Sequence, residues 1–215
     1  MKVSTGTGII MLMWSILAGC SAGHEPVLPF FNSADFTPVW IEKSDPGYTT
    51  IHRIPAFSFV DQEGHTVSES DLNGKITVAD FFFTFCPGIC PRLTKSMGDV
   101  QSAFQGDSSV LLLSHSVTPD LDDVSELREY ADLHDVHYNQ WRLLTGKRSE
   151  IYTVARAGYF ADEETGVQKG PDEFLHTENF ILVDGKRRIR GVYNGTNPTE
   201  VERLIEDIKI LKHEL

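Results

Sequence analysis

The chain has 215 residues, which is long enough for one domain with a hydrophobic core of its own. Its hydrophobic content of 40% and its charged content of 23% are those of an ordinary globular protein. The formal net charge is −12. This acidic balance argues against nucleic acid or an anionic lipid surface as the main partner.

Residues 1–19 are predicted to be a targeting segment that is absent from the mature protein. Lys2 supplies a short positive start, and the apolar run over residues 9–17 is too short to span a bilayer. The run ends in Leu17-Ala18-Gly19-Cys20, which resembles the bacterial lipoprotein box. That resemblance implies cleavage before Cys20 and a lipid on its sulfur. We therefore expect an extracytoplasmic domain in the cell envelope, lipid-anchored to a bacterial membrane, inner or outer.

Residues 20–50 are rich in proline, polar and aromatic side chains without a sustained period. We expect a lipid-anchored tether there, with Phe30, Phe31 and Trp40 covering the surface of the domain. A single domain should then occupy residues 51–215. Its first predicted elements are a strand over residues 54–60, a turn over 61–64 and a returning strand over 65–67.

A strand, a turn and a helix follow one another over residues 76–104, and the turn holds two cysteines. Pro91 fits the first turn of a helix, so Cys90 should lie at the helix N-terminus, where free N–H groups and the helix dipole favour a thiolate. Cys86 and Cys90 lie four positions apart around one turn. Their sulfurs can converge either on each other, as a disulfide, or on a soft metal ion. The apolar residues expected on the buried helix face are Leu93, Met97, Val100 and Phe104.

The remaining pattern predicts further strands and helices in alternation. Asp122 and Asp123 should form the acidic first turn of the second helix, and residues 141–146 form a short strand or a turn. Residues 158–175 form a polar, acidic loop whose length suggests a function. The predicted strands are 110–117, 179–183 and 189–193, and the predicted helices lie around 124–131, 151–155 and 197–211. This order predicts an α/β fold, a thioredoxin-like sandwich whose central mixed sheet is flanked by helices.

Three pieces of the chain then combine into one pattern. The block from Cys86 to Pro91 has the form Cys-Pro-x-x-Cys-Pro, Ser116-Val117-Thr118-Pro119-Asp120 ends the next buried strand, and His176 stands shortly before the strand at residue 179. Together they resemble the Sco/SenC family, the copper-delivery and redox proteins of cytochrome c oxidase assembly, over about residues 54–211. The resemblance implies copper, as Cu(I) or Cu(II), bound by Cys86, Cys90 and His176. It implies as partner the copper-site subunit of cytochrome oxidase or another copper or thiol protein.

The ligand set makes chemical sense, because two thiolates suit soft Cu(I) and an imidazole also allows Cu(II). Of the eight histidines, only His115 and His176 lie near predicted strand ends that face the thiols, and His115 fits a buried core histidine equally well. The family usually has His where Phe85 stands, Asp where Gly88 stands and Asp where Leu175 stands. The three ligands are retained, but fewer polar residues are left to orient them.

Asp80 lies six residues before Cys86, where thioredoxin carries a buried acid beneath its active site. It is either a solvated strand residue or, if buried, a group that exchanges protons with the thiols. Two functions therefore remain open. One is a metallochaperone that delivers copper to an oxidase subunit or maintains its thiols. The other is a thiol–disulfide oxidoreductase, acting as a reductase with Cys86 as nucleophile and Cys90 as resolving thiol. Only the first function needs His176.

Overall fold

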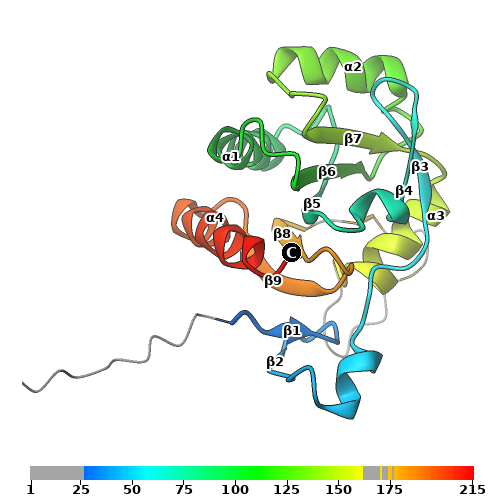
Figure 1. Ribbon diagram of the computed structural model, residues 1–215. Helices are drawn as coiled ribbons and strands as arrows, with labels where there is room; N and C mark the ends of the chain where they lie inside the picture. Colours follow the sequence, from blue (N-terminus) through cyan, green and yellow to red (C-terminus); the bar gives the residue numbers. More distant parts are fainter. Residues whose placement is uncertain (1–26, 162–169, 171–173, 176) are drawn as a thin grey trace, which may run out of the picture.

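The computed structural model describes residues 27–161, 170, 174–175 and 177–215. Its main feature is a seven-stranded mixed sheet in the order β4-β3-β7-β6-β5-β8-β9 (Figure 1). The strands are β3 (Ser58–Asp61), β4 (Thr66–Ser68), β5 (Ile76–Phe82), β6 (Val110–Ser116), β7 (Trp141–Thr145), β8 (Asn179–Val183) and β9 (Ile189–Asn194). β5, β6 and β7 run parallel, and the other neighbours pair antiparallel. The predicted mixed sheet of an α/β sandwich is confirmed.

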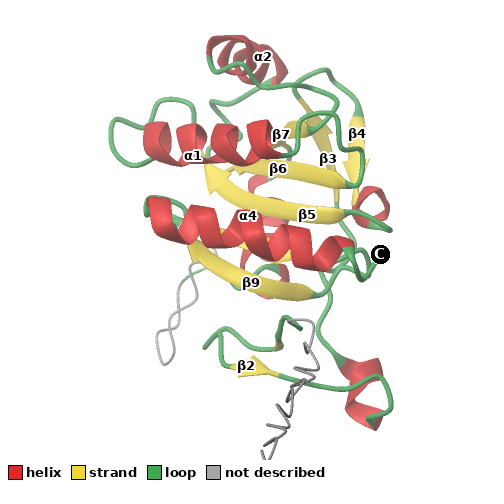
Figure 2. Cartoon of the chain, turned by 60° about the vertical axis from the view of Figure 1, so that its left-hand side comes forward, coloured by secondary structure: helices red, strands yellow, loops and turns green. Residues whose placement is uncertain are grey.

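Four α-helices flank this sheet, as Figure 2 shows for α1 and α4, which lie side by side across one face. The helices are α1 (Cys90–Ala103), α2 (Val124–Leu133), α3 (Arg148–Thr153) and α4 (Pro198–Lys212), and α3 continues into a π-helical turn (Val154–Gly158). One apolar cluster joins α1, α2 and α4 to the sheet, and a second joins α3 to the opposite face. Every residue of β5 and β6 is buried, as expected for parallel strands covered on both faces.

The helix boundaries follow the capping chemistry of the sequence. In α1 the four predicted core positions, from Leu93 to Phe104, are all buried. In α4 the Asn197 side chain accepts a hydrogen bond from the Thr199 amide at 3.1 Å, and Pro198 begins the helix. The part of the chain that the structure describes contains no helix long and apolar enough to cross a membrane.

Of two predictions about local structure, one is resolved in favour of its strand alternative and the other is wrong. Residues 141–145, predicted as a strand or a turn, form strand β7, which pairs with both β3 and β6. Asp122 is not part of an acidic first turn. Asp123 is the N-cap of α2 and accepts hydrogen bonds from the Ser125 and Glu126 amides, whereas Asp122 precedes the helix and is fully buried.

Residues 27–50, within the predicted tether, pack against the edge of the sheet. They contain a two-stranded ribbon of β1 (Phe30–Phe31) and β2 (Pro38–Val39) and a 3₁₀ turn (Pro46–Thr50), and β1 contacts β9. Of the three aromatic residues expected to cover the domain, Phe30 is buried, Phe31 is half-buried and Trp40 is exposed. The predicted division of the chain into 1–19, 20–50 and 51–215 stays a prediction.

Candidate functional site

The two thiols lie at the carboxyl end of the central strand. β5 ends at Phe82, a short connection carries Cys86, and α1 begins at Cys90 with Pro91 in its first turn. The connection from β9 closes over the same end of α1. Gly195 packs so tightly there that an added Cβ would lie 2.7 Å from the side chains of Leu93 and Phe180. The sheet and the helices α1 and α4 therefore fix the position of the connection that carries Cys86.

Both cysteines are free thiols with different environments. Cys86 is partly exposed, and Cys90 is buried with 3% of its surface accessible. Partial burial disfavours the Cys86 thiolate, but hydrogen bonds from the Cys90 thiol and from the amides of Cys90, Gly88 and Ile89 outweigh it and lower the pKa of Cys86. Cys86 is therefore the accessible thiol that ionises first, as expected of a nucleophile.

Cys90 begins α1, as predicted, but the prediction that this position favours its thiolate is wrong. Burial and the hydrogen bond to Cys86 raise the pKa of Cys90 to about 12, and the neighbouring charges of Cys86 and Asp80 act in the same direction. The helix dipole favours a thiolate, but desolvation of a sulfur that packs in the apolar cluster under α1 and α4 is the larger effect.

Asp80 is buried beneath the thiols and is not a solvated strand residue. It has 2% of its surface exposed, and it lies opposite Ser114 in the β5–β6 register. Burial raises the pKa of Asp80 to about 7, against a hydrogen bond with Ser114 that lowers it. The Ser114 hydroxyl also accepts a hydrogen bond from the Trp141 indole at 2.8 Å. Asp80 Oδ1 has no hydrogen-bond partner among the side chains that the structure describes, so this acid is available for proton exchange near neutral pH.

Asp122 is a site residue that the sequence pattern did not reveal. Its Oδ1 accepts a hydrogen bond from the Thr84 hydroxyl at 2.6 Å, and its Oδ2 accepts from Ser116 at 2.5 Å and Thr118 at 2.9 Å. Thr84 lies two residues before Cys86, so this buried carboxylate joins the thiol connection to the end of β6. One sequence feature could have indicated Asp122. Hydroxyl residues gather at the ends of β5 and β6, and a buried carboxylate needs such hydrogen-bond donors.

An apolar rim surrounds the accessible thiol. Phe85 is 67% exposed beside Cys86, and Phe174 is 45% exposed. The rings of Phe83 and Phe174 meet edge to face with centroids 5.6 Å apart, and Phe83 lies in the thiol connection between β5 and α1. The segment that ends at Leu175 therefore contacts this connection.

The predicted ligand His176 lies outside the described residues, as does the predicted lipidation residue Cys20. Leu175, directly before His176, is buried with 1% of its surface exposed in the cluster on the α3 side of the sheet. Within residues 27–161 and the described parts beyond them, no group of three or more His, Cys, Asp and Glu side chains is arranged to hold a metal ion.

His115 does not face the thiols. It is fully buried on the other side of the sheet, against the rings of Phe57, Phe59, Phe81 and Tyr159. Burial lowers the pKa of His115 to about 3, and neither ring nitrogen has a hydrogen-bond partner in the described part of the chain. His115 is therefore a core histidine, but the hydrogen-bonding capacity of its ring nitrogens is not satisfied.

Comparison with known proteins agrees with this architecture. The SCO1/SenC family matches residues 48–213, and the chain belongs to that family. BsSco, described as a member of the Sco family of cytochrome c oxidase assembly proteins with a disulfide switch, superposes with a TM-score of 0.64 at 29% identity, over 75% of this chain and 94% of BsSco.

Two further solved structures are similar. A SCO1/SenC family lipoprotein from Bacillus anthracis has a TM-score of 0.65 at 30% identity, over 75% of this chain and 95% of its own. Copper-bound ScoI from Bradyrhizobium japonicum has a TM-score of 0.59 at 26% identity, over 73% of this chain and 98% of its own. The sandwich of this chain is thus the Sco fold, with its thiol pair at the end of β5.

Proposed function

We propose that this chain is a membrane-anchored copper-binding protein of the cell envelope that delivers copper to a respiratory cytochrome oxidase subunit or maintains the thiols of that subunit. The observation that carries the proposal is the pair of free thiols in hydrogen-bond contact, one accessible and one buried, at the end of β5. The copper-bound relative and the relative described as an oxidase assembly protein support it.

Cys86, Cys90 and His176 are the proposed ligands. Sulfurs close enough to share a hydrogen bond can bind one soft Cu(I) ion, and an imidazole added to them allows Cu(II). The contact between Phe174 and Phe83 supports the choice of His176, because it places a residue two positions before His176 against the thiol connection. Three protein ligands at a partly exposed thiol leave room for a partner's ligands to take the ion.

Anaerobic Cu(I) titration of the reduced protein tests this ligand set. We expect about one Cu(I) per chain, loss of tight binding in Cys86→Ala and in Cys90→Ala, and weakened Cu(II) binding in His176→Ala. His137→Ala is the matched control, because His137 is an exposed histidine away from the thiols. Unchanged tight Cu(I) binding in either cysteine variant would refute the site.

The second candidate function is thiol–disulfide exchange. It is favoured by the opposite pKa shifts of Cys86 and Cys90 and by the buried acid Asp80. The Cys86 thiolate attacks one sulfur of a partner disulfide, forming a mixed disulfide and releasing a partner thiolate that takes up a proton. Asp80 then accepts the proton of Cys90. The Cys90 thiolate attacks the Cys86 sulfur, which forms the Cys86–Cys90 disulfide and releases the second partner thiolate, and this thiolate then takes up a proton. Two electrons pass from this chain to the partner.

Two variants distinguish the functions. Asp80→Asn removes the proton acceptor and should slow the second step of exchange without removing a copper ligand. His176→Ala should weaken Cu(II) binding and leave the exchange rate nearly unchanged, because imidazole suits Cu(II) and takes no part in exchange. Intact Cu(II) binding without His176, together with slow exchange in Asp80→Asn, would make the reductase the better description.

Anchoring is part of the proposal and rests on Cys20. The similar lipoprotein from Bacillus anthracis supports a lipid on this cysteine. We expect the mature protein to fractionate with membranes and to carry the mass of a lipid, and Cys20→Ser to lose both properties. A Cys20→Ser protein that keeps the membrane association and the added mass would contradict this assignment.

A further inference from the structure

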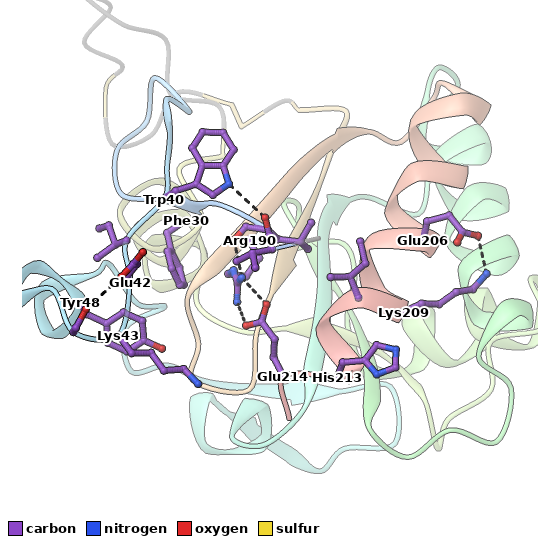
Figure 3. Close-up of a pocket in the computed structure, with 15 residues that line it drawn as sticks. Phe30, Trp40, Glu42, Lys43, Tyr48, Arg190, Glu206, Lys209, His213 and Glu214 are labelled. Carbon is purple, nitrogen blue, oxygen red and sulfur yellow. Dashed lines mark hydrogen bonds and ion pairs between the residues drawn. The ribbon is translucent and has the colours of Figure 1, made fainter. Parts of the chain in front are cut away.

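A large hollow lies far from the thiols, between residues 27–48 and the C-terminal half of α4. Its volume is about 1140 Å³, which is slightly above the usual range for ligand pockets in proteins. Figure 3 shows Phe30 and Trp40 on one wall and Glu206, Lys209 and His213 of α4 on the other. Its apolar lining residues are Val27, Leu28, Phe30, Trp40, Ile41 and Ile210.

Two of these apolar side chains project into solvent at the rim. Trp40 is 66% exposed and Val27 is 64% exposed. The Trp40 indole N–H donates to the Val27 carbonyl at 3.4 Å, so its one polar group is directed at the protein and its ring faces outward. An exposed amphipathic indole next to aliphatic side chains is the arrangement found where proteins meet the lipid–water interface.

The charged floor of the hollow is not available to a ligand. Arg190 is fully buried, and all its N–H groups are engaged. They donate to the Pro29 carbonyl at 3.0 Å, the Leu28 carbonyl at 2.8 Å and Asp184 at 3.3 Å. They also donate to Glu214 at 2.7 and 2.9 Å, as Figure 3 shows. A small anion therefore finds no free guanidinium here. The exposed lining consists of the apolar rim and of charged side chains of both signs, among them Glu42, Lys43, Glu206 and Lys209.

The same contacts fix the point where the chain leaves the domain. Because Arg190 holds Leu28 and Pro29, Val27 stays at the rim. Between Val27 and the proposed lipid-bearing Cys20 there are only residues 21–26, which span at most about 25 Å even when extended. A bilayer that holds Cys20 is therefore always within reach of this rim.

We propose that the rim formed by Val27, Trp40 and Ile41 rests on the phospholipid bilayer, with the Trp40 ring inserted at the headgroup level. This inference rests on the proposed lipidation of Cys20. The contact is apolar and needs no anionic lipid, so it is compatible with the acidic net charge of the chain. Exposed Lys43 beside the hollow can reach lipid phosphates in the same orientation.

The orientation places the thiols at the end of the molecule remote from this rim. Arg92 Nη2 donates to the Thr196 carbonyl at 3.1 Å, which joins the N-terminal ends of α1 and α4, and Lys212 pairs with Asp107 at their other ends. The two helices therefore run parallel. The hollow lies beside residues 206–214, so its first lining residue on α4 is eight residues, or about 12 Å, beyond the end of the helix that lies near the thiols. Cys86 then remains open to a partner while the domain lies on the membrane.

Tryptophan fluorescence of the mature protein in phosphatidylcholine vesicles tests the proposal. Without residues 1–19 the chain has two tryptophans, exposed Trp40 and Trp141, which is 1% exposed and serves as an internal control. We expect vesicles to shift the Trp40 emission to shorter wavelength, to protect it from aqueous acrylamide, and to make it quenchable by brominated phosphatidylcholine. Trp40→Phe should abolish the bromolipid quenching while keeping two titratable thiols.

Trp40 that stays equally accessible to acrylamide with and without vesicles would overturn the proposal. Protection of Trp40 from acrylamide that needs no vesicles and grows with protein concentration would also overturn it, because the rim would then bind a second copy of the chain. The intact mass of each preparation reports the lipid on Cys20 separately. If that lipid is absent, the anchoring proposal fails, and quenching of the unlipidated protein at high vesicle concentration still decides whether the rim binds a bilayer.

Discussion

Two buried ionisable residues lie on opposite faces of the same strand pair. Asp80 of β5 faces α1, and His115 of β6 faces the aromatic cluster on the α3 side. Burial raises the pKa of Asp80 to about 7 and lowers the pKa of His115 to about 3. Both groups are therefore favoured in their neutral forms, and their effects on stability have opposite dependence on pH.

For Asp80 the folded-state pKa lies above the ordinary value of 3.8. The protonated Asp80 carboxyl therefore contributes its full stabilisation of the folded state below pH 3.8, and this contribution is lost as the pH rises through 7. Compared with Asp80→Asn, the free energy of unfolding of the unchanged protein should fall by about 4 kcal/mol across this window, at 1.36 kcal/mol per pKa unit. Urea unfolding of both proteins under reducing conditions between pH 4 and 8 measures the difference. Asp99→Asn, at an exposed position, should show none, and a pH-independent difference for Asp80→Asn would contradict the buried acid.

For His115 the folded-state pKa lies below the ordinary value of 6.5. The unfolded chain then binds a proton that the folded chain excludes, so stability falls as the pH drops from 6.5 toward 3. His115→Phe, which suits the surrounding rings, should remove up to about 3 kcal/mol of this acid sensitivity between pH 7 and 4. Thermal unfolding between pH 4 and 7 checks it, with exposed His137→Gln as control. Equal acid sensitivity in His115→Phe would show that the imidazole is hydrated in the folded state.

At the scale of single elements, the connection from β6 to α2 depends on two adjacent acids with separate tasks. Asp123 caps α2, and asparagine caps helices as well as aspartate does. Asp122 accepts three hydroxyl hydrogen bonds that hold the thiol connection, and an amide cannot accept all three.

Asp122→Asn should therefore lower the free energy of unfolding by about 2–3 kcal/mol, the cost of a broken charge-assisted hydrogen bond in the interior. It should also change the rate at which Cys86 reacts with iodoacetamide, because Thr84 loses its partner. Asp123→Asn should shift stability by less than about 0.5 kcal/mol. Denaturant unfolding and alkylation rates of the pair supply the measurement, and equal effects of the two substitutions would argue against a positioning role for Asp122.

Elements with strong local signals could be predicted from the sequence, and those that depend on distant neighbours could not. The apolar period of α1 and the Asn197 cap of α4 are local, and both are confirmed. The short apolar segment of β7 becomes a strand only because β3 and β6 pair with it. The same division holds at the site. The cysteine spacing is visible in the sequence, but which thiol ionises is decided by burial of Cys90 in an apolar cluster assembled from several parts of the chain.

At the scale of the whole molecule, Arg190 joins the two ends of the described chain. It contacts Leu28 and Pro29 near the start and Glu214 near the end. Removing one partner of a buried ion pair commonly costs about 3–5 kcal/mol. Arg190→Met should cost that much and should expose residues 27–50 to protease before the rest of the domain.

Limited proteolysis with mass spectrometry and urea unfolding measure both effects. Lys95→Met, which breaks the exposed pair with Asp99, should cost less than about 1 kcal/mol. Thiol alkylation in Arg190→Met should keep its ordinary rate, because the thiols lie at the other end of α4. If residues 27–50 remain protected in Arg190→Met, other contacts hold this segment.

The place of β5 between β6 and β8 has a consequence for how the protein acquires its shape. Val78 pairs with Leu112 on one side and with Leu182 on the other, and the second contact closes a loop of roughly a hundred residues, which makes folding slow. The apolar cluster that contains Cys90 also includes residues of α4, at the very end of the chain. Cys90 therefore stays an ordinary accessible thiol until the end of the chain has docked, and disulfide formation with wrong partners competes with folding for that whole interval.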